Sequence, residues 1–185
     1  SFKIGSFAYP GAQEPILKDI SFEAHPGEIT AIIGGTGRGK SSILKAVLGE
    51  KICHTGDLII GTHLEYSYVS QNTSFLAGSL RNYIRENSLD ESLLKTILRK
   101  LGFSREQFDK RLEDYSSGQK KKVLLAASLC KPAHLYIWDE PLNFIDVLSR
   151  IQIEHLICQY QPTMLFVEHD RMFMENVATK VVALR

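Results

Sequence analysis

The sequence predicts an α/β protein built on a mostly parallel sheet. An apolar run at residues 31–33 leads through a glycine-rich turn into an amphipathic stretch that begins at Lys40, which is a strand-loop-helix unit. Residues 134–184 then alternate apolar strands with helical stretches. Those strands are almost continuously apolar, as expected for a parallel sheet covered on both faces. With 185 residues, of which 44% are hydrophobic, we expect one domain over residues 1–185.

The N-terminal part is expected to be rich in strands. Residues 16–24 alternate apolar and polar side chains, and the sequence HPGE at 25–28 predicts a turn before the strand at 31–33. Beyond the helix that begins near Lys40, residues 56–61 and 65–71 predict two more strands. We therefore expect an antiparallel β unit beside the parallel core.

The pattern becomes helical from Ser79 to about Lys131, which predicts a small helical subdomain over residues 79–131. Asp90 is the expected N-cap of one helix. Six leucine and isoleucine side chains are predicted to share one face of that helix: Leu89, Leu93, Leu94, Ile97, Leu98 and Leu101. The chain then returns to strands at 134–138, 163–168 and 177–184, separated by a helix at 146–160 and a shorter one.

A phosphate-binding loop is predicted at residues 34–41, whose sequence GGTGRGKS fits the pattern G-x-x-x-x-G-K-[ST]. Glycines let the backbone curl so that N–H groups point inward, beside the positive end of the following helix. Lys40 would neutralise the outer phosphates, and Ser41 would offer its hydroxyl to Mg²⁺. The residues expected to bind a nucleoside triphosphate here are Gly34, Gly35, Thr36, Gly37, Arg38, Gly39, Lys40, Ser41 and Ser42.

Two carboxylates, Asp139 and Glu140, end the apolar strand LYIWD. Ligands of a doubly wound sheet bind at this edge, so Asp139 is expected to hold Mg²⁺ through water and Glu140 to polarise an attacking water. The alternative is an acidic strand end that only caps the next turn. The phosphate loop in the same chain favours the catalytic interpretation.

Residues 115–129, YSSGQKKKVLLAASL, resemble the signature motif of ATP-binding-cassette (ABC) ATPases, usually L-S-G-G-Q. In that family the motif reaches the γ-phosphate of a nucleotide across a dimer interface, and the simpler alternative here is a plain helix N-cap. Tyr115 replaces the usual leucine and Ser117 the first glycine, which adds bulk where two domains would meet. The motif residues expected to contact nucleotide are Ser116, Ser117, Gly118 and Gln119.

Other landmarks of the family follow in the expected order. Tyr9 matches the aromatic residue that stacks on adenine, Gln71 the Q-loop, Asp146 in NFID the D-loop, and His169 the switch histidine. The resemblance implies ATP and Mg²⁺ as cofactors. It also implies that the catalytic residues are Glu140, His169, Gln71 and Lys40, and that the metal ligands are Ser41, Gln71 and Asp139.

The resemblance extends to a subfamily. Residues 168–182 are similar to the second cassette of the F subfamily, which consists of duplicated ABC ATPases that act on ribosomes, and residues 120–147 to its Lsa- and Vga-like antibiotic-resistance members. The implied partners are a second cassette, in the same chain or in a homodimer, and the ribosome. One alternative is the ATPase subunit of an ABC membrane transporter with a permease partner. Another is a regulatory module that holds ATP with little turnover.

Composition sets further limits. A net charge of +1 gives no global reason to expect nucleic acid, and the lysines at 120–122 are expected to be a solvated helix face rather than an RNA patch. Cys53, Cys130 and Cys158 contain no C-x-x-C pair, so we expect reduced thiols and a cytoplasmic location. The sequence has no apolar run of 18 residues, so membrane insertion is not expected. The start at Ser1 suggests a fragment of a longer protein.

Overall fold

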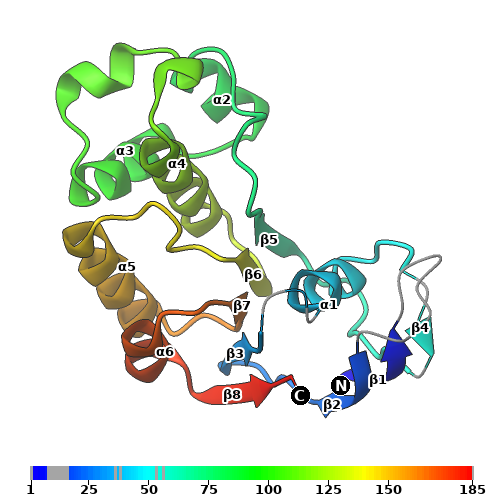
Figure 1. Cartoon of the computed structure of the whole chain (residues 1–185). Coiled ribbons are helices and arrows are strands. Elements are labelled where there is room, and N and C mark those ends of the chain that lie inside the picture. The colour runs from blue at the N-terminus through cyan, green and yellow to red at the C-terminus, as the bar shows by residue number, and fades with distance from the viewer. Residues whose placement is uncertain are drawn as a thin grey trace.

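The core is a five-stranded parallel sheet, as the sequence predicts (Figure 1). The computed structural model describes residues 2–7, 17–35, 37, 39–52, 54–55 and 57–184. The strand order is β5-β6-β7-β3-β8, and each neighbouring pair is parallel. The strands are β3 (Ile29–Ile33), β5 (Tyr66–Val69), β6 (Leu135–Asp139), β7 (Met164–Val167) and β8 (Lys180–Ala183).

Both faces of this sheet are covered. Helix α1 (Lys40–Val47) lies on one side, and α4 (Ser117–Cys130), α5 (Val147–Tyr160) and α6 (Arg171–Val177) lie on the other (Figure 1). Neighbouring residues of one strand therefore enter different cores: Ile32 packs in the cluster that contains α1, and Ala31 in the cluster that contains α4 and α5. Burial on both faces explains why these strands are apolar at almost every position.

A separate antiparallel sheet is formed by β2 (Leu17–Phe22), β1 (Phe2–Phe7) and β4 (His54–Thr55), which confirms the predicted antiparallel unit. The strand predicted at 56–61 is wrong, because within its described part only Leu58 forms a bridge. Leu58 and Ile60 are partly buried against the α1 cluster, while Ile59 is 65% exposed. The apolar side chains of this segment thus pack onto the core from a loop and do not form a strand.

The helical part contains α2 (Leu80–Glu86), α3 (Glu91–Lys100), short 3₁₀ turns at Arg105–Asp109 and Leu112–Asp114, and α4. Asp90 caps α3 as predicted, since its carboxylate accepts the N–H of Leu93 at 2.7 Å. The prediction that Leu93 joins the buried face is wrong: it is 42% exposed, whereas Leu94 and Leu98 are fully buried. Leu93 lies about 100° around the helix from Leu94, just outside the apolar stripe.

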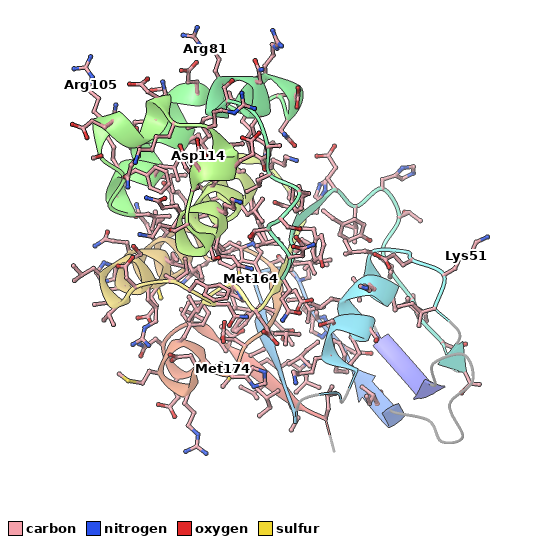
Figure 2. The ribbon with its side chains drawn as sticks, turned by 45° about the horizontal axis from the view of Figure 1, so that its top comes forward. Lys51, Arg81, Arg105, Asp114, Met164 and Met174 are labelled. Atoms are coloured by element: carbon pink, nitrogen blue, oxygen red, sulfur yellow. The ribbon has the colours of Figure 1, made fainter. Side chains whose placement is uncertain are left out.

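Helix α4 connects this helical part to the sheet. Its residue Ser128 accepts the N–H of the Trp138 indole at 2.9 Å, and Ser67 of β5 lies 2.7 Å from the same hydroxyl. In Figure 2, Arg81 and Arg105 project from the far end of the helical part, while Met164 lies at the centre of the molecule. Within the described part of the chain, no helix combines the length and apolar character needed to cross a membrane.

Candidate functional site

The candidate residues gather where four parallel strands end. Gly34 follows β3, Gln71 follows β5 after one residue, Glu140 follows β6, and His169 follows β7 after one residue. Because the strands are parallel, their carboxyl ends lie at the same edge of the sheet. Residues up to 135 positions apart in the sequence are thus brought to one place by the fold alone.

The phosphate loop curls back around its own lysine. The ammonium of Lys40 donates to the carbonyls of Gly34 and Gly35, each at 2.8 Å, and Lys40 is only 6% exposed. Gly37 and Gly39 have φ angles of 77° and 73°, which glycine adopts without the steric cost that other residues meet. The loop has the curled backbone that the sequence predicts. Tyr9, Thr36 and Arg38 lie outside the described residues.

The N-terminus of α1 fits an anionic ligand. No side chain caps this helix, and its first turn contains no acidic residue. The other α-helices of the described chain each begin with a capping side chain: Ser79, Asp90, Ser116, Asp146 and Asp170. An uncapped helix start adjoining a glycine loop and a buried lysine is suited to the phosphates of a nucleotide.

Ser41, at the end of the loop, and Asp139 form a hydrogen-bonded pair of oxygen-bearing side chains. The Ser41 hydroxyl donates to Oδ1 of Asp139 at 3.2 Å, and Asp139 is 3% exposed. Burial raises the pKa of Asp139, the Ser41 hydrogen bond opposes this rise, and the charge of Glu140 adds to it. Hydroxyl and carboxylate oxygens fit Mg²⁺. No cluster of three or more His, Cys, Asp or Glu side chains in the described chain could hold a metal, so the ion would need phosphate and water oxygens too.

Glu140 is held by three side chains from different segments. Its Oε2 accepts from the Gln71 amide at 3.0 Å and from the Asn143 amide at 2.7 Å, and its Oε1 lies 3.5 Å from Nε2 of His169. Glu140 itself has a φ of 47°, an uncommon left-handed conformation for this residue type. The sequence alone predicts Gln71, Glu140 and His169 as site residues, whereas Asn143, in the motif NFID, has no predicted role.

The signature residues lie at the start of α4, where the local helix-cap interpretation also holds. The Ser116 hydroxyl accepts the N–H of Gln119 at 3.2 Å, and the Gln119 side-chain oxygen accepts the N–H of Ser116 at 3.0 Å. Ser117 is exposed. A Cβ at Gly118 would lie 2.5 Å from the carbonyl oxygen of Phe144. Gly118 therefore lets α4 touch the segment that carries Asp146, at a distance no larger residue permits.

Asp146 has two roles in this chain. It caps α5 by accepting the N–H of Ser149 at 2.9 Å, and it pairs with the ammonium of Lys122 at 2.6 Å. Although burial alone would raise the pKa of Asp146, hydrogen bonds from Lys122 and Ser149 lower it below its ordinary value. Among described hydrogen bonds, none joins Asp146 or the signature residues to the phosphate loop, so the structure forms two groups of candidates.

The prediction of a solvated lysine face at 120–122 is wrong. Lys121 is 0% exposed and donates to the carbonyls of Ser70 and Gln71 at 3.0 and 3.2 Å. The side chain of Lys122 is 13% exposed and is paired with Asp146. These partners come from segments far from the lysines in sequence, so the local charge pattern gives no sign of them.

Glu168, which is not predicted from the sequence as a site residue, is 4% exposed. Its carboxylate accepts the N–H of Leu142 at 3.1 Å and the N–H of His169 at 2.7 Å. It thereby fixes the end of β7 to the segment that follows Glu140. The available signal was a carboxylate that ends an otherwise apolar strand, next to His169.

Comparisons with known sequences are consistent with this geometry. A family model described as ABC transporter matches residues 17–143. The chain is 32% identical to the ATP-binding protein Uup of Buchnera aphidicola subsp. Acyrthosiphon pisum, over 97% of the chain and 31% of that protein. It is 30% identical to ABC transporter F family member 2 of Arabidopsis thaliana, over 86% of the chain and 24% of that protein. The chain thus spans less than a third of either relative.

Solved structures agree on the fold. An archaeal ribosome recycling factor, aABCE1, crystallised in complex with the ribosomal stalk protein aP1, matches with a TM-score of 0.76 and 23% identity, over 98% of the chain and 36% of that structure. An ATP-binding subunit of an ABC transporter matches with a TM-score of 0.82 and 20% identity, over 99% and 85%. At these identities the likeness concerns the fold alone.

Proposed function

The chain belongs to the ABC transporter family of ATP-binding domains, and we propose that it is the ATP-hydrolysing cassette of an F-subfamily protein that acts on the ribosome. The observation that carries the hydrolytic part is the grouping of Gln71, Asn143 and His169 around Glu140. That carboxylate adjoins Asp139 at the edge where the phosphate loop lies.

In the proposed reaction the phosphate loop and Lys40 hold the phosphates of ATP. Ser41 and Asp139 would hold Mg²⁺, which would neutralise charge on the phosphates. Glu140 orients and polarises the attacking water, and the amides of Gln71 and Asn143 fix one of its oxygens. His169 lies beside the other oxygen. It is proposed to contact the γ-phosphate. Tyr9 is proposed to stack on adenine.

A second cassette is the proposed partner for the surface around Ser116–Gln119, which we call the signature surface. Next to the start of α4, the turn at Phe144 and the start of α5 expose three apolar side chains: Phe144 at 75%, Val147 at 64% and Leu148 at 76%. An apolar patch of this kind indicates a surface that another protein covers. We infer that Ser116–Gln119 and Asp146 act on the nucleotide of that cassette, supplied by the same full-length chain or by a second copy.

The F-subfamily assignment is supported by the relatives named above, which include an F family member. A ribosomal partner is proposed from the F-subfamily resemblance, and the fold shared with a ribosome recycling factor is compatible with it. The Lsa- and Vga-like specificity, with antibiotic resistance, and the cytoplasmic location remain predictions from the sequence. The alternative is an ATPase subunit that couples to a membrane permease, and the fold shared with a transporter subunit is equally compatible with it.

The test uses the full-length protein with Glu140→Gln and the same change at the matching carboxylate of the other cassette. These substitutions remove the base and leave the phosphate loop intact. ATP should therefore bind without being hydrolysed and keep the two cassettes in contact. The protein is captured with ATP, and ribosomal RNA and membrane proteins are measured in the eluate. The control carries Lys40→Ala and the same change at the matching lysine of the other cassette, so it cannot hold ATP, and it is captured in the same way.

Enrichment of ribosomes that requires ATP and is lost in Lys40→Ala supports the proposal. Co-purification of a permease without ribosomes contradicts it and supports the transporter alternative.

A further inference from the structure

One buried cation has no role in the reaction outlined above. Lys121 lies in the first turns of α4, and its side chain is 0% exposed. A buried ammonium is costly unless it is hydrogen-bonded, and replacing it by an apolar residue is often tolerated. Its presence calls for an explanation beyond filling the core.

The partners of Lys121 are backbone carbonyls. Its ammonium donates to the oxygens of Ser70 at 3.0 Å and Gln71 at 3.2 Å, the two residues that follow β5. Within the described chain no carboxylate lies at ion-pair distance from it, although Asp139, Glu140 and Glu168 are near enough to act through their charges. Burial lowers the pKa of Lys121, and these three charges partly oppose that effect. The ammonium therefore fixes the path of one backbone segment.

That segment carries the amide that holds Glu140. The carbonyl of Gln71 accepts from Lys121, and the side chain of Gln71 donates to Oε2 of Glu140 at 3.0 Å. A continuous series of contacts thus runs from α4 through Gln71 to the carboxylate. Figure 1 shows α4 reaching from the helical part down toward the ends of β5 and β6. The same helix begins at Ser116, whose turn forms the signature surface.

We propose that Lys121 is a positioning residue for ATP hydrolysis. It fixes the backbone of Ser70 and Gln71 to α4, so the position of the helical subdomain determines how the Gln71 amide contacts Glu140. Contact of the signature surface with a second cassette would then change the position of the Glu140 carboxylate of this chain. The inference rests on the proposed function, and the experiments below separate the two.

The first test compares Lys121→Met with Lys100→Met in the full-length protein, with the other active site silenced. Lys100→Met removes a lysine charge from the exposed end of α3, in the same subdomain. We expect Lys121→Met to bind ATP within about twofold of the unmodified protein, because the phosphate loop is untouched. Its kcat should fall about tenfold, the scale of one lost charged hydrogen bond, while Lys100→Met keeps the original kcat.

A second comparison separates positioning from mere packing. If Lys121 acts through Gln71, Lys121→Met should lower kcat by less than about twofold in a protein that already carries Gln71→Ala. Independent tenfold losses that multiply would overturn the proposal, as would an unchanged kcat in Lys121→Met. Should Lys121→Met not fold, Lys121→Gln keeps a neutral N–H donor and carries the same comparisons.

Hydrogen exchange tests the contact without any turnover. In nucleotide-free protein, amides of residues 70–76 should exchange faster in Lys121→Met, while those of β6 stay as they are. Equal exchange at 70–76 in both proteins overturns the proposal. Failure of the proposed function would look different, because full-length protein that neither binds nor hydrolyses ATP could still show the exchange effect.

Discussion

Gly118→Ala tests the contact between the signature helix and the segment that carries Asp146. The added Cβ would lie 2.5 Å from the carbonyl oxygen of Phe144, a backbone atom that can move only if its segment shifts. Phe144 already has a φ of 66°, so the segment has little conformational freedom to absorb the shift. Overpacking costs about 1–3 kcal/mol, whereas alanine gains up to about 1 kcal/mol over glycine in a helix. The net expectation is a loss of about 1 kcal/mol in the free energy of unfolding.

The two effects have opposite signs, so urea denaturation at 25 °C decides between them. Ser117→Ala is the matched control, because Ser117 is the exposed neighbour in the same turn and its replacement should change stability by less than about 0.5 kcal/mol. A Gly118→Ala protein that is more stable than the original chain would refute the close contact, since helix propensity would then act unopposed.

Three further predictions follow from the site. Lys40→Ala should abolish Mg-ATP binding in a fluorescent-nucleotide titration, because the phosphates lose the buried cation held at Gly34 and Gly35; wild-type affinity would contradict the phosphate-loop assignment. Asp139→Asn should raise the denaturation midpoint at pH 7 without Mg²⁺. Because burial raises the pKa of Asp139, its ionised carboxylate destabilises the folded protein above that pKa. The stability gained with Asn should vanish below about pH 4, where the Asp139 carboxyl is protonated in the folded and in the unfolded chain. A gain that persists at pH 3 would show a different origin. Asp146→Asn keeps a capping side chain but removes the pair with Lys122, so it should cost about 0.5 kcal/mol at pH 7, a small value because Asp146 is half exposed. The pKa of Asp146 is lower in the folded protein than in the unfolded chain. Its charge therefore stabilises the fold above its ordinary pKa, and this stabilisation is lost as the pH falls toward the pKa of the folded protein. Urea denaturation from pH 7 down to pH 2 should show the difference between the two proteins shrinking, and a constant difference would argue against the ion pair.

The parts of the site that sequence could predict are those that a strand end fixes locally. Asp139, Glu140, Gln71 and His169 each stand at or just after an apolar strand, so a parallel sheet brings them to one edge whatever the loops do. The glycines and Lys40 form one continuous motif, and its backbone curl follows from their spacing.

What sequence could not predict depends on partners far along the chain. In the sequence Lys121 is one of three adjacent lysines, which is typical of a solvated helix face. Its burial depends on the carbonyls of Ser70 and Gln71, to which its ammonium donates. The short apolar run in the sequence GDLIIG at residues 56–61 is typical of a strand, yet Leu58 and Ile60 pack against the α1 cluster from a loop. In both cases the burial of the side chain depends on elements that are distant in sequence, so the local pattern alone could not predict it.

The assignment of Glu140 as the group that activates water is tested by the fate of bound nucleotide. Full-length protein carrying Glu140→Gln, with the matching change in the other cassette, is mixed with labelled Mg-ATP, and bound ATP and ADP are quantified over time. The account predicts that ATP binds with unchanged affinity and stays intact, with hydrolysis slowed about 10²-fold or more, because the phosphate loop remains while the base is lost. Accumulation of bound ADP at the rate of the unmodified protein would contradict the assignment of Glu140 as the group that activates water.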